Sequence, residues 1–268
     1  MTTGIDTPLT AQGMIDIDFS ALSLAQLEAM ETAAFDVLDS LGRLARAGTT
    51  ITDEILKAQG PFLEWDHYPA GDVYDWNSHS QYYYHAHPAG NRPPRFPEGF
   101  WSAEHGHFHT FLRAQGMPEG AAPADVPGAD DGTPREAALS HIIAISMGPD
   151  GMPFRLFTTN RWVTNEQWYD AETVIRLIDH FAMTCALPSR PVNTWITSML
   201  RLFRPQIENL LRQRDAALAE RMADNEGSEI NAFDDRELEI ASMTEISVDA
   251  HIERLAAELK QRRTAANS

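Results

Sequence analysis

The chain has 268 residues, 43% of them hydrophobic and 22% charged, with one cysteine and a formal net charge of −18. One cysteine excludes an intramolecular disulfide, and the negative charge disfavours nucleic acid as a partner because it would repel a polyanion. No run approaches the roughly 18 apolar residues of a membrane span, and residues 1–10 lack the pattern of a secretory signal. We therefore expect a cytoplasmic protein with no membrane partner.

Residues 1–60 are expected to form an N-terminal helical segment. Ser23 is a candidate N-cap, and apolar residues recur at helical spacing after it until Gly48 ends the pattern. This apolar stripe consists of Leu27, Met30, Ala34, Leu38, Leu41 and Leu44. A second short helix is expected over residues 52–58, and we interpret both helices as packing elements.

A β-sheet is expected after residue 61, where aromatic residues and histidines replace the Ala/Leu-rich sequence. Residues 81–87 and 105–112 have the aromatic content of strands. Residues 116–133 are rich in Ala, Pro, Gly and Asp, which is typical of a long surface loop. Residues 141–147 and 153–159 then flank a Pro-Asp-Gly turn, the clearest hairpin signal in the chain. Together these segments predict an antiparallel sheet of at least four strands.

The last third of the chain is expected to be helical. Asp170 is a candidate cap, residues 192–203 form an amphipathic face, and Pro205 suits the first turn of the next helix. Residues 224–246 are acidic and are interpreted as a solvated connector before a last amphipathic helix. That helix could dock on the body or on a second subunit, so a homo-oligomer through the C-terminal helices is possible.

The predicted fold class is therefore α+β. An antiparallel sheet of at least four strands carries the histidine clusters, and N- and C-terminal α-helices flank it. The chain is divided into an N-terminal helical segment over 1–60, a core domain over 61–220, and an acidic connector with an amphipathic helix over 221–268.

Histidines are concentrated in one part of the chain. Seven of the ten lie between His67 and His109, and the two predicted strands contain the patterns His-Ala-His and His-Gly-His-Phe-His. Residues i and i+2 of a strand point to the same face, so pairing the two strands would bring up to five imidazoles together. Imidazole is the commonest metal ligand in proteins. The predicted metal ligands are His85, His87, His105, His107 and His109.

Other polar residues are candidates for catalytic roles around such a site. Tyr83 shares the histidine face and could donate a proton or stabilise an oxyanion. Glu104 could accept the second ring N–H of a metal-bound histidine or take an acid–base role. Arg161, after the hairpin, could bind a carboxylate or phosphate of a substrate. His67, His79 and His141 could complete the site or serve only in packing, whereas His180 and His251 are expected to be structural.

Two known motifs resemble parts of this pattern. His85-Ala86-His87 is similar to the HxH pair of cupins, although the next glutamate, Glu98, follows after ten intervening residues rather than three or four. His105 to Leu112 resembles the histidine-triad motif of nucleotide hydrolases and transferases, which implies His107 as the nucleophile. Gly106 and Thr110 stand where that motif has apolar residues.

A third resemblance covers more of the chain. The segments 81–87, 104–109 and 157–164 together look like a bacterial domain family of unknown function, over most of residues 60–220. This resemblance implies one coherent domain and supplies no activity.

Three functions follow from these observations. The leading hypothesis is an enzyme that depends on iron, zinc or haem and acts on a small-molecule substrate. Zinc would favour hydrolysis and iron would allow oxidative chemistry. The second is nucleotidyl or phosphoryl transfer with His107 as nucleophile and no metal. The third is a non-catalytic metal- or haem-binding module, or an interaction protein with an acidic tail.

Overall fold

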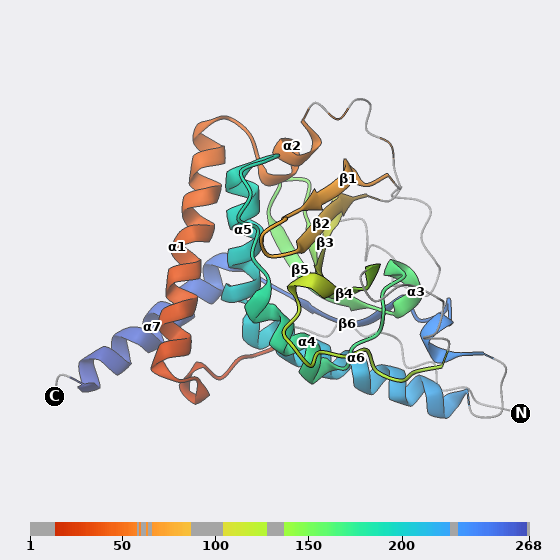
Figure 1. Ribbon diagram of the computed structural model, residues 1–268. Helices are drawn as coiled ribbons and strands as arrows, with labels where there is room; N and C mark the ends of the chain where they lie inside the picture. Colours follow the sequence, from red (N-terminus) through yellow and green to blue (C-terminus); the bar gives the residue numbers. More distant parts are fainter. Residues whose placement is uncertain are drawn as a thin grey trace, which may run out of the picture.

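The computed structural model of the protein describes residues 14–57, 59, 63, 66–86, 104–127, 137–225 and 230–266. Within these ranges, six strands form one antiparallel sheet in the order β1-β2-β3-β4-β5-β6 (Figure 1). The strands are β1 (Tyr68–Tyr74), β2 (Ser80–His85), β3 (Gly106–Arg113), β4 (Leu139–Met147), β5 (Pro153–Thr159) and β6 (Ile240–Glu245). The α+β class and a sheet of at least four antiparallel strands are thus confirmed.

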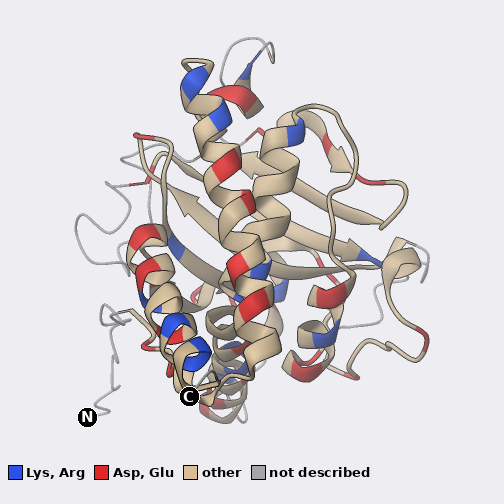
Figure 2. Ribbon diagram, turned by 90° about the vertical axis from the view of Figure 1, so that its left-hand side faces the viewer, with Lys and Arg blue, Asp and Glu red and all other residues tan. Residues whose placement is uncertain are grey.

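Helices form the second part of the structure. They are α1 (Leu24–Arg46), α2 (Ile51–Leu56), α3 (Arg161–Thr164), α4 (Ala171–Leu177), α5 (Arg190–Leu202), α6 (Arg204–Asp224) and α7 (Val248–Ala266). Helix α1 packs along α5 and also contacts α7, whereas α6 packs on β5 and β6. In Figure 2 the outer helices face the viewer with the sheet behind them, and acidic and basic residues are interspersed along them.

Local capping fixes where two of the predicted helices begin. Ser23 caps α1: its hydroxyl accepts the backbone N–H of Gln26 at 3.2 Å, and the Gln26 side chain accepts the Ser23 N–H at 2.9 Å. Asp170 caps α4 by accepting the N–H of Thr173 at 2.7 Å. Each contact satisfies a backbone donor that the first helical turn leaves unpaired. Both caps were predicted from the sequence.

The main apolar core lies between one face of the sheet and the helices. Tyr82, Tyr84 and Phe108 belong to this core, and the Phe108 ring lies 5.7 Å from that of Trp195 in α5. The Tyr82 hydroxyl donates to Asn193 Oδ1 at 2.7 Å. Since side chains alternate along a strand, the residues between these aromatics point to the opposite face of the sheet.

The segment expected as an acidic connector contains a strand. Strand β6 pairs with β5 in antiparallel register, with Met243 opposite Phe157. Ser242, also on β6, hydrogen-bonds to Thr158 Oγ1 at 2.6 Å and donates to the carbonyl of Leu210 at 2.7 Å, which ties the strand to α6. Five of its six residues are buried.

Of the helices that the structure describes, none has the length and apolar character to cross a lipid bilayer.

Candidate metal centre

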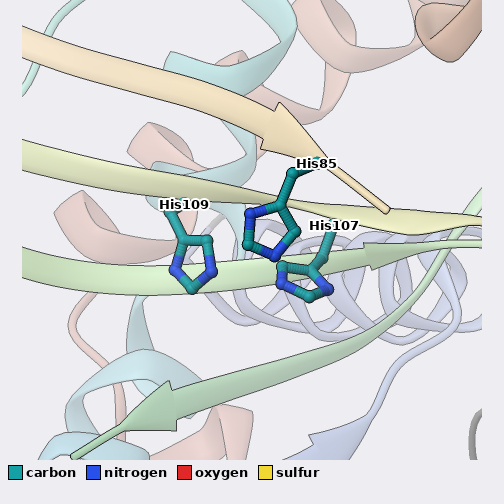
Figure 3. A group of neighbouring side chains, drawn as sticks. All are labelled: His85, His107 and His109. Carbon is teal, nitrogen blue, oxygen red and sulfur yellow. The ribbon is translucent and has the colours of Figure 1, made fainter. Parts of the chain in front are cut away.

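Three imidazoles come together on the face of the sheet opposite the main core. His85 lies on β2 directly across from His107 on β3, and His109 follows two residues later on the same strand. One nitrogen from each ring lies within 4.8 Å of the others (Figure 3). Within the described part of the chain, this is the group of histidine, cysteine and acidic side chains placed to hold a metal ion.

Burial keeps His109 neutral. The residue is 1% exposed, and burial, followed by the neighbouring His107 and His141, holds the pKa of His109 well below its usual value. A histidine must be neutral to bind a metal ion. His109 is therefore neutral at neutral pH, as metal binding requires.

The two nitrogens of His109 have different surroundings. Nδ1 lies 3.0 Å from Nε2 of His141, whose Nδ1 in turn lies 3.4 Å from the Thr159 hydroxyl. Nε2 of His109 is buried and has no hydrogen-bond partner among the described residues. A buried nitrogen without a partner is costly because it has lost its water. Coordination of a metal ion through Nε2 would remove that cost.

His107 is held by a carboxylate. Its Nδ1 lies 2.5 Å from Oε1 of Glu104, whose side chain is fully buried, and Oε2 of Glu104 lies 3.8 Å from Nη1 of Arg155. Metal-bound histidines commonly donate their second ring N–H to a carboxylate, which orients the ring and raises its basicity. Because Nδ1 faces Glu104, a metal ion would be bound through Nε2 of His107.

The spacing of the three nitrogens is close to that of a coordination sphere. Zinc–nitrogen bonds of about 2.0–2.1 Å in tetrahedral geometry place ligand nitrogens roughly 3.4 Å apart. The nitrogens here all lie within 4.8 Å of one another. Small rotations of the side chains would close the remaining difference.

Two other histidines considered as ligands, His105 and His79, make side-chain contacts outside the three-histidine group. Nδ1 of His105 lies 2.5 Å from the Tyr84 hydroxyl, and His105 is outside the three-histidine group. His79 lies at the β1–β2 turn, where its Nδ1 is 2.5 Å from the Tyr74 hydroxyl. His141 contacts His109, as described above. His87 falls outside the described residues.

Tyr83 lies beside the cluster. Its ring centroid is 5.1 Å from that of His109 and 5.6 Å from that of His85, and the ring stacks on His67 at 3.6 Å with an interplanar angle of 7°. Burial, assisted by Asp72 and Glu166, raises the pKa of Tyr83 above its usual value. Tyr83 therefore stays protonated at neutral pH and can act as a hydrogen-bond donor.

Arg161, a predicted catalytic residue, is paired with an acidic side chain in this structure. The Arg161 guanidinium donates to both carboxylate oxygens of Asp234, at 2.6 and 2.7 Å, and lies over the Phe233 ring. Arg155, which sequence reasoning did not select, contacts Glu104 instead. Ser146 was also missed, although β4 places it directly opposite His107. Only the strand register could have revealed both residues.

A helix-backed antiparallel sheet with three clustered histidines on its other face defines an α+β protein with a candidate metal centre. The chain belongs to a family described as a domain of unknown function (DUF6969), whose model matches residues 31–246. The expectation of an uncharacterised domain family is thus confirmed, and the match extends beyond residues 60–220 on both sides. Neither the curated proteins nor the solved structures contain a match to this chain.

Proposed function

We propose that the protein binds one transition-metal ion through His85, His107 and His109 and uses it to act on a small-molecule substrate. The observation that carries this proposal is the convergence of three ring nitrogens within 4.8 Å, one of which, Nε2 of buried His109, has no hydrogen-bond partner among the described residues. Histidines that served only as a polar, solvent-exposed row would not be buried as His107 and His109 are.

Among the described residues the cluster offers three ligands, and this number favours a reactive rather than a structural centre. Structural zinc sites use four protein ligands, whereas catalytic sites use three and leave a position for water or substrate. Three neutral nitrogen donors also match the His₃ donor set of catalytic zinc more closely than the two-histidine, one-carboxylate set of non-haem iron. Glu104 is engaged with His107, so we favour zinc over iron.

A single ion also suits the geometry better than haem. Haem iron takes its protein ligands along one axis, on opposite faces of a flat ring. Here two ligands come from one strand and the third from directly across on the next strand, so all three approach from the same sheet face. When bound, the metal would supply Lewis acidity to a ligand on its open side. Tyr83 would offer a hydroxyl donor there, and Glu104 would hold His107 in place.

Elemental analysis of untagged protein purified without chelators tests this proposal. We expect close to one zinc ion per chain, or stoichiometric zinc or iron after reconstitution. His107→Ala and His109→Ala should abolish binding while leaving the circular dichroism spectrum unchanged, because the core on the helix side of the sheet does not include these side chains. His180→Ala removes an exposed histidine and is the matched control.

A protein that stays free of metal after reconstitution would overturn the proposal. Equal metal content in the wild type and in both the His107→Ala and His109→Ala variants would do the same. In the metal-free case, phosphorylation of His107 by a nucleotide substrate would instead support phosphoryl transfer.

A further inference from the structure

A row of polar residues crosses the sheet next to the histidines. Antiparallel partners project from the same face, so the strand register places these side chains side by side. From β2 to β6 the row consists of His85, His107, Ser146, Arg155 and Glu245. The metal ligands occupy one end of the row, and exposed Glu245 occupies the other.

Ser146 lies in the middle of this row. It is fully buried, and its hydroxyl makes no hydrogen bond to any residue that the structure describes. Buried hydroxyls in proteins are nearly always hydrogen-bonded. Its neighbours on this face are His107 on one side and Arg155 on the other. The Ser146 hydroxyl is therefore placed to hydrogen-bond to a small molecule that lies between His107, a proposed metal ligand, and the guanidinium of Arg155.

The charges around Ser146 favour an anion. The Arg155 side chain is only 6% exposed, and the carboxylate of Glu104 is shared between its guanidinium and the His107 ring. Three neutral imidazoles leave the two positive charges of a divalent ion uncompensated. Glu104 and Glu245, which lies opposite Arg155, together offset two charges, so a divalent ion with Arg155 still leaves a net positive charge that a bound anion would reduce.

From this arrangement we infer that Ser146 and Arg155 form a subsite for the carboxylate group of an anionic small-molecule substrate, beside the metal. The inference rests on the proposed metal centre. A carboxylate has two acceptor oxygens, and the row supplies two different donors for them, a hydroxyl and a guanidinium. The Ser146 hydroxyl would fix the orientation of the substrate carboxylate, and the positive charge of Arg155 would supply most of the binding energy.

Cobalt(II) in place of the native metal provides a direct measurement. Isothermal titration calorimetry of acetate into the cobalt-loaded protein detects binding beside the metal as well as on it, and the visible absorption of cobalt reports that the metal centre is loaded. We expect saturable binding, and we expect Ser146→Ala to raise the acetate Kd about tenfold, the size of effect expected for a hydrogen bond to a charged group. Ser140→Ala is the matched control, because Ser140 is a buried serine on the same strand that lies opposite Leu112 of the main core.

Arg155→Gln provides a second variant if Ser146→Ala does not fold. It should abolish acetate binding at concentrations that saturate the wild type, with cobalt content measured first because Arg155 also contacts Glu104. Inorganic phosphate is titrated in parallel, and binding of phosphate with no binding of acetate would overturn the carboxylate assignment.

The outcomes separate this inference from the proposed function. If the wild type takes up no cobalt, both fail. If cobalt binds but acetate does not, or if acetate binds equally well to the wild type, Ser146→Ala and Arg155→Gln, the metal centre stands and the subsite is overturned.

Discussion

His109 and His141 share a hydrogen bond between ring nitrogens, Nδ1 to Nε2 at 3.0 Å, in a part of the sheet where neither ring reaches solvent. Burial, followed by Arg214 and His107, lowers the pKa of His141 to about 3, so both rings are neutral at pH 7 and one must donate to the other. Donation from Nδ1 of His109 would leave the lone pair of its Nε2 available for the proposed metal ion. In that arrangement His141 would select the tautomer of His109 without being a ligand itself.

His141→Leu should therefore weaken metal binding without removing a ligand. The substitution deletes the acceptor for Nδ1–H of His109, and loss of such a supporting contact costs roughly ten- to a hundredfold in metal affinity. Competition with a chromophoric chelator measures the effect, with one metal ion per chain still bound at saturation. An unchanged affinity would show that the contact between the two histidines does not orient His109.

Substitution of Glu104 should distinguish between two possible roles of this residue, orientation of the metal ligand His107 and acid–base catalysis. Glu104→Gln keeps an oxygen acceptor for Nδ1 of His107 but loses the charge, and Glu104→Ala loses both. We expect metal affinity to fall roughly tenfold in the first variant and further in the second. Loss of activity with full metal affinity in both variants would instead identify Glu104 as an acid–base group.

Gly106→Ala should disturb the site through packing. A Cβ at this position would lie 2.5 Å from both the His85 carbonyl oxygen and the Tyr84 hydroxyl. Either β2 or the Tyr84 ring must move, and such overpacking costs about 1–3 kcal/mol. Thermal unfolding and metal titration of this variant should show lower stability and weaker metal binding together. Gly120→Ala, where a Cβ would have open space around a positive φ, provides a comparison in which only stability should fall.

The sequence was sufficient to predict the helices, the central strands and the face on which the histidines lie. Capping residues such as Ser23 and Asp170 act on their immediate neighbours, and alternation along β2 and β3 is a local property. Strand β6 was missed because two of its five buried residues, Ser242 and Thr244, are polar, and the burial of Ser242 depends on partners in β5 and α6. Local polarity alone made this segment look like a solvated connector.

The candidate site was also predictable only in part, because some of its contacts depend on strand register rather than on local sequence. His85, His107 and His109 follow from the two-residue spacing, but His105 would share their face only if β3 continued regularly before Gly106. The Tyr84 ring packs over Gly106 and its hydroxyl meets His105. Ser146 and Arg155 reach the histidines through the register of β4 and β5, and the sequence does not specify that register.

Asp75 predicts an acid-sensitive component of stability. Burial alone would raise its pKa, but hydrogen bonds from Asn77, Ser78 and Thr184 outweigh burial and lower the pKa to about 2. A folded-state pKa below the unfolded value of 3.8 means that the contribution is complete above pH 3.8 and is lost as the pH falls toward 2.

Urea denaturation between pH 5 and pH 2 measures this contribution. Asp75→Asn should lower the free energy of unfolding by about 2–3 kcal/mol at pH 5 and by much less at pH 2. Asp39→Asn removes an exposed carboxylate and serves as the control. An equal loss at both pH values would show that the carboxylate charge of Asp75 is not what stabilises the fold.

The order of the strands has a consequence for synthesis on the ribosome. Strands β1 to β5 pair with neighbours that are made in succession, but β5 ends at Thr159 and its second partner, β6, begins only at Ile240. While helices α3 to α6 are being translated, a nascent chain that has already formed the β4–β5 hairpin presents the unpaired N–H and C=O groups of β5 as an open edge. Such edges recruit strands from other chains. The β5 edge therefore stays open until β6 emerges, and we expect a chain truncated before residue 240 to aggregate more readily than the full chain.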